Sequence, residues 1–194
     1  MVVIANFSKR LFDLSASFLA VVLLLPVLIV ISIIIKLGSK GPVLFRQERA
    51  GKSGKPFTLY KFRTMKVDVD PFGQSPQTGD DPRLIKAGKF LREYSLDELP
   101  QFFNVLKADM SLVGPRPLYL SQIAQCSENH KKRLLVRPGI TGMSQIYARS
   151  ELMTKRSLDL EVEYVEKQSF WFDIKILFTT VLVVLKKQDV YEES

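Results

Sequence analysis

The chain has 194 residues, enough for one compact domain with a membrane segment but too few for two full domains. Its 28 Lys and Arg residues outnumber 20 Asp and Glu residues, and the formal net charge of +8 indicates anionic partners: nucleic acid, acidic lipid headgroups or phosphorylated substrates. The single cysteine, Cys126, excludes an intrachain disulfide framework, and we expect it to be a buried small side chain.

An apolar segment over residues 14–37 is the first predicted element, and its only polar side chains are Ser15, Ser17, Ser32 and Lys36. As a straight helix it would reach roughly 36 Å, whereas the hydrocarbon core of a bilayer is about 30 Å thick. Pro26 lies near its middle, where it removes one backbone hydrogen bond and predicts a kink or a break. The segment is therefore long enough to cross a membrane but interrupted at its centre.

Basic residues flank this segment on both sides: Lys9 and Arg10 precede it, and Lys36, Lys40, Arg46 and Arg49 follow it. This pattern favours a re-entrant helix, which enters the membrane, breaks near Pro26 and returns to the cytoplasmic face. A kinked transmembrane span is the alternative, because transmembrane helices tolerate prolines. Both interpretations leave the rest of the chain in the cytoplasm. We predict a membrane anchor over residues 1–37 and a cytoplasmic domain over residues 38–194.

Two strand-like runs follow, Val43–Arg49 and Phe57–Met65, and the glycine-bearing turn Gly51–Gly54 between them predicts a β-hairpin. The period of two places Lys61 and Arg63 on one face of the second strand. These two cations either solvate an exposed edge or contact an anion.

The remainder of the chain is predicted to be mainly helical. The loop Lys66–Arg83 has three prolines and no apolar period, which is typical of a lid or a surface loop. Helical spacing of apolar residues predicts helices over Leu84–Tyr94, Gln101–Lys107, Glu151–Lys167 and Phe170–Lys187. The last of these has aromatic residues and a basic end, which suits either a membrane interface or a core position. We expect an α-rich α/β domain with a small hairpin.

The acidic pair Asp97 and Glu98 lies in the segment Ser95–Pro100. Pro100 suits the first turn of a helix, and carboxylates at the positive end of a helix are favoured in their ionised form. Adjacent helical residues point in different directions, so the two carboxylates can hold different roles. The alternative is purely structural: Asp97 caps the helix and Glu98 forms a capping box with Ser95.

Two arginines stand beside prolines further along the chain. Arg116, between Pro115 and Pro117, has a restricted backbone and is suited to bidentate phosphate binding, or it belongs to a rigid exposed turn. Arg137 begins the segment Arg137–Gly142, whose backbone amides either cradle a phosphate or form a plain surface turn. The single histidine, His130, is expected on a solvated face.

The order of these motifs resembles that of the bacterial sugar transferases, in their small monotopic form. The basic-flanked apolar segment with a central proline comes first, and five motifs follow it: Gly41–Gln47, Tyr60–Met65, Leu96–Gln101, Met110–Pro117 and Arg137–Gly142. The resemblance covers roughly residues 6–187. One departure is Leu25, which precedes Pro26 where the family usually has serine.

The resemblance implies transfer of a sugar 1-phosphate from a UDP-sugar to polyprenyl (undecaprenyl) phosphate, with release of UMP through a phosphosugar–aspartyl intermediate. Asp97 matches the nucleophile, and Glu98 assists it through metal or proton handling. Both would hold Mg²⁺, which offsets diphosphate charge. Substrate phosphates would be bound by five basic residues: Lys61, Arg63, Arg92, Arg116 and Arg137.

The implied location is the cytoplasmic face of the bacterial inner membrane, in contact with phospholipid. A homo-oligomer is compatible with the sequence, and no motif specifies the sugar. Two other functions use the same charge. A non-catalytic membrane adaptor needs the anchor but not Asp97. A nucleic-acid binder is disfavoured, because the aromatic residues are not interleaved with cations along strands.

Overall fold

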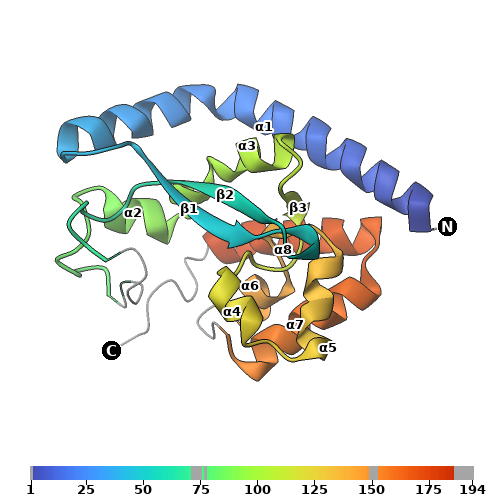
Figure 1. Cartoon of the computed structure of the whole chain (residues 1–194). Helices are drawn as coiled ribbons and strands as arrows, with labels where there is room; N and C mark the ends of the chain where they lie inside the picture. Colours follow the sequence, from blue (N-terminus) through green and yellow to red (C-terminus); the bar gives the residue numbers. More distant parts are fainter. Residues whose placement is uncertain (1, 71–75, 77, 149–152, 186–194) are drawn as a thin grey trace.

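The computed structural model describes residues 2–70, 76, 78–148 and 153–185. A long helix, α1 (Val2–Gly38), lies along one side of a body that contains every other described element (Figure 1). The body begins with the strands β1 (Leu44–Ala50) and β2 (Pro56–Phe62), joined by the 3-10 turn η1 (Lys52–Gly54). Its later elements are α2 (Gly88–Glu93), η2 (Leu96–Glu98), α3 (Gln101–Leu106), β3 (Ser111–Val113), α4 (Leu120–Ala124), α5 (Glu128–Lys131), η3 (Lys132–Leu135), β4 (Gly139–Thr141), α6 (Met143–Tyr147), α7 (Lys155–Lys167) and α8 (Phe170–Leu185).

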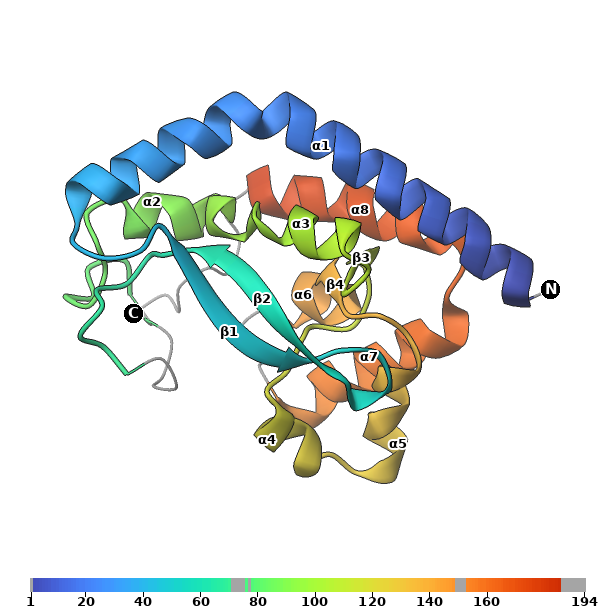
Figure 2. The same cartoon turned by 45° about the horizontal axis from the view of Figure 1, so that its top comes forward.

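Helix α1 is continuous through Pro26, where the sequence predicted a kink or a break. Figure 2 shows that the helix changes direction near its middle, so it forms an arch over the body. The physical reason is that proline removes a single backbone hydrogen bond, and the turns on either side keep theirs. By length and composition the stretch Phe7–Gly38 is able to cross a membrane.

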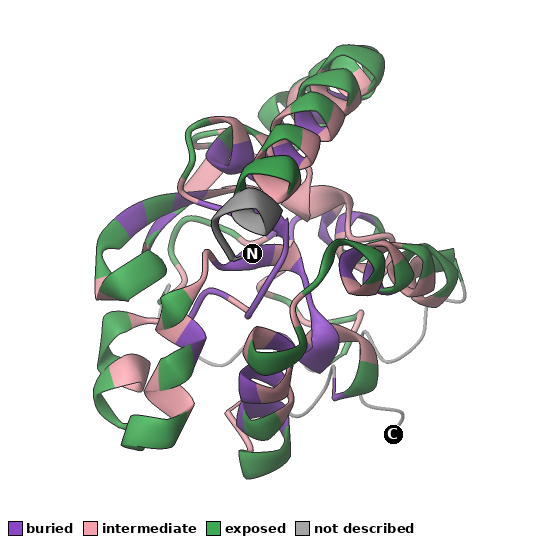
Figure 3. Cartoon of the chain, turned by 90° about the vertical axis from the view of Figure 1, so that its right-hand side faces the viewer, coloured by how far each residue is buried: buried purple, intermediate pink, exposed green. Residues whose placement is uncertain are grey.

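Both ends of α1 pack against the body, and the outward side of its middle is exposed. Near its start, Phe12 and Ala16 pack on a core cluster that contains Tyr164 and Ile176. Near its end, three side chains are buried with Phe62, Ile85 and Leu91 of the body: Leu28, Ile31 and Ile35. Between these contacts Phe18, Leu19, Val22, Leu23 and Leu25 are 49–68% exposed. Figure 3 shows exposed residues along much of the length of the helix. The arch therefore offers its apolar middle to its surroundings.

A buried polar network fixes the start of α1. The Lys9 ammonium lies 2.5 Å from the Asp173 carboxylate of α8, and Tyr164 of α7 donates to the same carboxylate at 2.8 Å. One helical turn later, the Asp13 carboxylate accepts bonds from the Ser111 hydroxyl at 2.8 Å and from the Leu112 amide at 3.2 Å. These charged groups lie almost wholly inside the protein and are matched by partners, as burial requires.

The hairpin forms as predicted. Strands β1 and β2 pair antiparallel from Leu44↔Phe62 to Ala50↔Pro56, and the turn uses Ser53 and Gly54 in left-handed conformations. The second strand ends at Phe62, before the expected Met65, which forms only an isolated bridge to Leu84. That bridge closes the neck of the predicted lid loop, of which residues 71–75 and 77 lie outside the described residues.

A second, parallel pair of short strands was not predicted. Strand β3 pairs with β4, and the amides of Gly114 and Gly139 donate to Thr141 and Pro115 at 2.9 Å each. A Cβ atom on either glycine would overlap the backbone of the other segment. The segment Arg137–Gly142 was interpreted as a phosphate cradle or a surface turn, and in the structure its Gly139 amide is used in this pairing.

The four predicted helices are present with shorter bounds, and the last one has a buried side and an exposed apolar side. Asp173 and Ile176 of α8 are buried in the core, whereas Trp171, Phe178 and Leu185 on its other side are exposed. Residues 151–152 and 186–187 of the predicted ranges lie outside the described residues. The expected α-rich α/β fold with a small hairpin is confirmed.

Candidate active site

The acidic pair lies on the 3-10 turn η2, between α2 and α3. Ser95 adopts a left-handed conformation (φ 54°) that turns the chain into η2, and its side chain makes no capping bond. Asp97 and Glu98 both lie in this first turn, and α3 begins only at Gln101. The capping-box alternative is therefore not what the structure shows.

Helix α3 positions this turn against the hairpin. Asn104, which is fully buried, accepts from the Tyr60 amide at 3.0 Å and donates to the Thr58 carbonyl at 2.7 Å. Its side chain thus takes the place of a neighbouring strand along the edge of β2. The docking brings η2 beside the end of β2 that carries Lys61.

Lys61 joins the hairpin to the acidic pair. Its ammonium lies 2.5 Å from Oε1 of Glu98, and both side chains remain 23% exposed. Asp97 also lies within the electrostatic influence of Lys61 and of Arg92, in the last turn of α2. The structure therefore brings four predicted site residues together: Asp97, Glu98, Lys61 and Arg92.

Asp97 has a carboxyl group that titrates close to neutral pH. Burial raises its pKa from 3.8 to about 6, because an ionised carboxylate loses solvation there. The charges of Lys61 and Arg92 oppose this rise, and the charge of Glu98 adds to it. A carboxyl group with such a raised pKa is a candidate catalytic group, since groups with perturbed pKa values concentrate at functional sites.

Arg49 is a site residue that the sequence analysis did not single out. Its guanidinium stacks 3.5 Å from the centre of the Tyr119 ring, and Nη2 donates to the Gln47 side chain at 2.5 Å. Burial lowers the pKa of Arg49 to about 10, and among the charges acting on it are those of Arg116 and Glu98. The sequence contained a pattern that points to Arg49. Gln47 and Arg49 are two residues apart, so they lie on one face of β1, and the pairing of the hairpin puts Lys61 on the same face.

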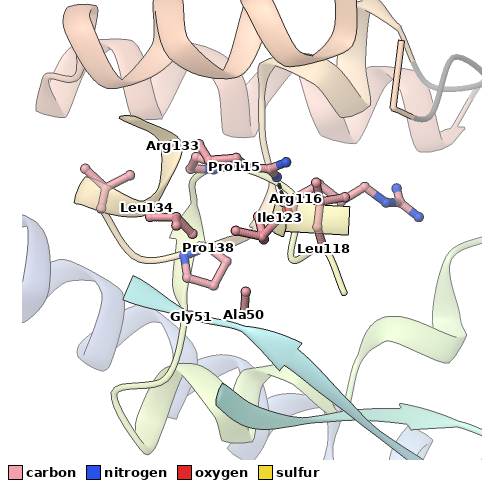
Figure 4. Close-up of a pocket in the computed structure, with 10 residues that line it drawn as sticks. Ala50, Gly51, Pro115, Arg116, Leu118, Ile123, Arg133, Leu134 and Pro138 are labelled. Atoms are coloured by element: carbon pink, nitrogen blue, oxygen red, sulfur yellow. Dashed lines mark hydrogen bonds between the residues drawn. The ribbon is translucent and has the colours of Figure 1, made fainter. Parts of the chain in front are cut away.

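Arg116 presents its side chain from a braced loop. Its amide donates to the Glu161 carboxylate at 3.1 Å, while the guanidinium has no hydrogen bond to any part of the chain that the structure describes. Figure 4 shows that this side chain points away from a small cavity between the hairpin turn and the loop Pro115–Leu118. A half-exposed cation with a fixed backbone matches the expected phosphate contact.

Two predicted phosphate ligands have other roles in the structure. Arg63 is 4% exposed and donates to the carbonyls of Pro42 at 2.7 Å and Lys40 at 2.6 Å, and to Ser39 at 2.9 Å. It braces the loop after α1 because β2 has already ended at Phe62. Arg137 donates to the Ala108 carbonyl at 2.8 Å, at the far end of α3 from Asp97. The arrangement favours structural roles for both.

The donor set at Asp97 and Glu98 suits a magnesium ion that shares its ligands with a substrate. Within the described residues no three metal-ligating side chains come together. Mg²⁺ is usually held by one or two carboxylates together with substrate phosphates and water, so an adjacent carboxylate pair is a fitting partial shell.

Comparisons with known proteins identify the family of this chain. The bacterial sugar transferase family model matches residues 4–187. An uncharacterised sugar transferase of Bacillus subtilis, EpsL, is 45% identical over 96% of this chain and 91% of its own length. The UDP-glucose:undecaprenyl-phosphate glucose-1-phosphate transferase of Escherichia coli is 46% identical over 89% of this chain, which spans 39% of that protein.

A third relative has a different sugar in its name. It is the UDP-N-acetylgalactosamine-undecaprenyl-phosphate N-acetylgalactosaminephosphotransferase of Aeromonas hydrophila, which is 38% identical over 92% of this chain and 44% of its own length. The range matched by the family model includes the acidic pair and Arg116 of this chain. The chain belongs to the bacterial sugar transferase family.

Proposed function

We propose that this protein transfers a sugar 1-phosphate from a UDP-sugar to undecaprenyl phosphate. The observation that carries the proposal is Asp97, a carboxyl group with a raised pKa that lies among Lys61, Glu98 and Arg92. Relatives in Escherichia coli and Aeromonas hydrophila are named for this kind of transfer with different sugars. Two anionic substrates that meet a carboxylate need compensating cations, and this site contains them.

The proposed reaction has two steps at one phosphorus atom. An Asp97 oxygen attacks the phosphorus that carries the sugar, and the bond from that phosphorus to the bridging oxygen breaks, so UMP leaves with the electron pair. An oxygen of undecaprenyl phosphate then attacks the same phosphorus. The bond to Asp97 breaks, which restores the carboxylate and yields undecaprenyl diphosphate sugar.

The surrounding residues have separate tasks in this proposal. Lys61, Arg92 and Arg116 compensate the charge of the substrate phosphates and orient them. Glu98 keeps Lys61 beside Asp97 through their 2.5 Å contact. Asp97 and Glu98 would hold Mg²⁺, which supplies further charge compensation at the diphosphate.

We also propose that α1 is re-entrant and that the domain lies on the cytoplasmic face of the inner membrane. The support is the attachment of both ends of α1 to one body, through Lys9 and Asp13 at its start and through Leu28, Ile31 and Ile35 at its end. A helix that crossed the bilayer would carry one of these ends to the opposite side. The exposed middle of the arch would lie in lipid, as would the exposed apolar side of α8.

The test is release of UMP from a panel of UDP-sugars, with and without undecaprenyl phosphate, by the full chain in detergent or nanodiscs with Mg²⁺. Without acceptor, the wild-type protein should release at most about one UMP per site and keep labelled sugar on Asp97, as located by peptide mapping. Asp97→Asn should release none above background, because an amide cannot form the acyl phosphate. No UMP release with any sugar would favour the adaptor function, and a label on another residue would contradict the mechanism.

A further inference from the structure

A buried ion pair lies behind Arg116, away from the acidic pair. Arg133 of η3 and Glu161 of α7 approach to 2.7 Å, and their side chains are 2% and 3% exposed. No step of the proposed reaction uses either of them. A buried ion pair is also a weak source of stability, because the cost of removing both charges from water consumes most of their attraction.

The pair contacts both peptide groups of Arg116. Glu161 Oε1 accepts the Arg116 amide hydrogen at 3.1 Å, and Arg133 Nη2 donates to the Arg116 carbonyl. The same Glu161 oxygen accepts from the Ser144 hydroxyl of α6 at 2.9 Å, which fixes the direction of the carboxylate. The backbone on the two sides of the Arg116 Cα atom is therefore clamped by opposite charges from two different elements.

The residues next to Arg116 are held as well. The Pro115 carbonyl accepts from the Gly139 amide at 2.9 Å, and the Pro117 carbonyl accepts from Arg49 Nη1 at 3.3 Å. Proline on both sides restricts the backbone further. With its backbone held in this way, Arg116 keeps freedom only in its side chain, which reduces the entropy lost when a phosphate binds it.

We infer that Glu161 and Arg133 are positioning residues that hold Arg116 ready for a substrate phosphate. The inference rests on the proposed function for its kinetic consequences, but the clamp itself is a feature of the fold. Neither residue touches the substrate in this proposal, and both act only through Arg116. Removing the clamp should therefore weaken substrate binding in proportion to what Arg116 contributes.

A double-mutant cycle tests this dependence. Glu161→Gln keeps the size of the side chain but removes its charge, and we expect it to lower kcat/KM for the UDP-sugar about tenfold, mainly through KM. In an Arg116→Ala background the same substitution should change kcat/KM less than about twofold, because nothing remains to be positioned. An equal loss in both backgrounds would mean that Glu161 supports the fold in general, and the inference would be wrong.

Glu166→Gln is the matched control. Glu166 lies on the same helix and pairs with Lys132, the neighbour of Arg133, at 3.6 Å, but both side chains are about half exposed. It should change neither kcat/KM nor the melting temperature. If Glu161→Gln does not fold, Arg133→Lys takes its place in the cycle, because lysine keeps the charge but lacks the planar fork.

Hydrogen exchange separates this inference from the proposed function. Peptides that cover residues 111–118 should exchange faster in Glu161→Gln than in wild type or Glu166→Gln, whether or not the protein releases UMP. Unchanged exchange there would show that the pair does not clamp Arg116. Absence of UMP release by the wild type would contradict the proposed function alone.

Discussion

Asp97 shows at the scale of one residue how a site acquires a reactive group. Its carboxyl group is half-buried on a one-turn helix, and loss of solvation outweighs the attraction of two nearby cations. The result is a pKa of about 6, so the group is largely ionised at neutral pH yet more basic than an ordinary aspartate. Greater basicity favours attack on phosphorus, which links the local geometry to the proposed chemistry.

The pH dependence of UMP release follows from this shift. Only the ionised form of Asp97 attacks, so kcat/KM should fall about tenfold per pH unit below the pKa of about 6. The measurement is a pH–rate profile of the first half-reaction. A profile that stays flat to pH 4.5 would show that Asp97 titrates normally.

The raised pKa of Asp97 also predicts that ionised Asp97 lowers the stability of the folded protein. The folded pKa of about 6 lies above the unfolded value of 3.8, so the folded state binds the proton more tightly and loses this stability as pH rises through about 6. Asp97→Asn should therefore be more stable than wild type at pH 7.5 by about 1–3 kcal/mol, and the difference should shrink toward pH 4. Melting curves of both proteins at the two pH values measure it.

Arg116 is expected to contribute through its planar guanidinium. Arg116→Ala should weaken the phosphate contact by about 1.5–3 kcal/mol, which corresponds to roughly a 10- to 150-fold loss in kcat/KM. Arg116→Lys should recover only part of this, because a point charge cannot bind two phosphate oxygens in one plane. Unchanged kinetics in the alanine variant would return Arg116 to the role of a rigid exposed turn.

At the scale of elements, the regular patterns of the chain were predictable and the exceptions have physical causes. Alternation and a glycine turn were enough to predict the hairpin, and helical spacing was enough for α3, α7 and α8. The parallel strands β3 and β4 have three residues each, too few for any period to appear. Their pairing depends on glycines that let two backbones touch, a contact between distant segments that a single sequence does not display.

The arginines illustrate the same limit within the site. Alternation along β2 puts Lys61 and Arg63 on one face, and the structure places Lys61 against Glu98, but the strand ends at Phe62. Arg63 therefore leaves the predicted face and bonds to the loop after α1. Arg49 shares the face of Lys61 across the hairpin, so the pairing of the strands, rather than either strand alone, identifies it. Local periodicity is informative about side-chain placement as far as the strand continues, and it gives no information beyond the end of the strand.

At the scale of the whole molecule, the arrangement of α1 determines how the protein can sit in a membrane. Cysteines placed at Asn6 and at the exposed Lys132 should both react with a membrane-impermeant maleimide from the cytoplasmic side. The reason is that Lys9 and Asp13 tie the start of α1 to the body that carries Lys132. Labelling of position 6 from the periplasm, with position 132 reactive only from the cytoplasm, would support a kinked span instead.

The tie between Lys9 and Asp173 also sets an order of events during synthesis. The two residues are 164 positions apart, so Asp173 leaves the ribosome long after Lys9. Until then the apolar helix has emerged without the body that holds its start, and such exposed apolar surface is prone to aggregation. The nascent α1 therefore needs lipid or a chaperone before its partner exists, and the body closes around its start only after α8 has been made.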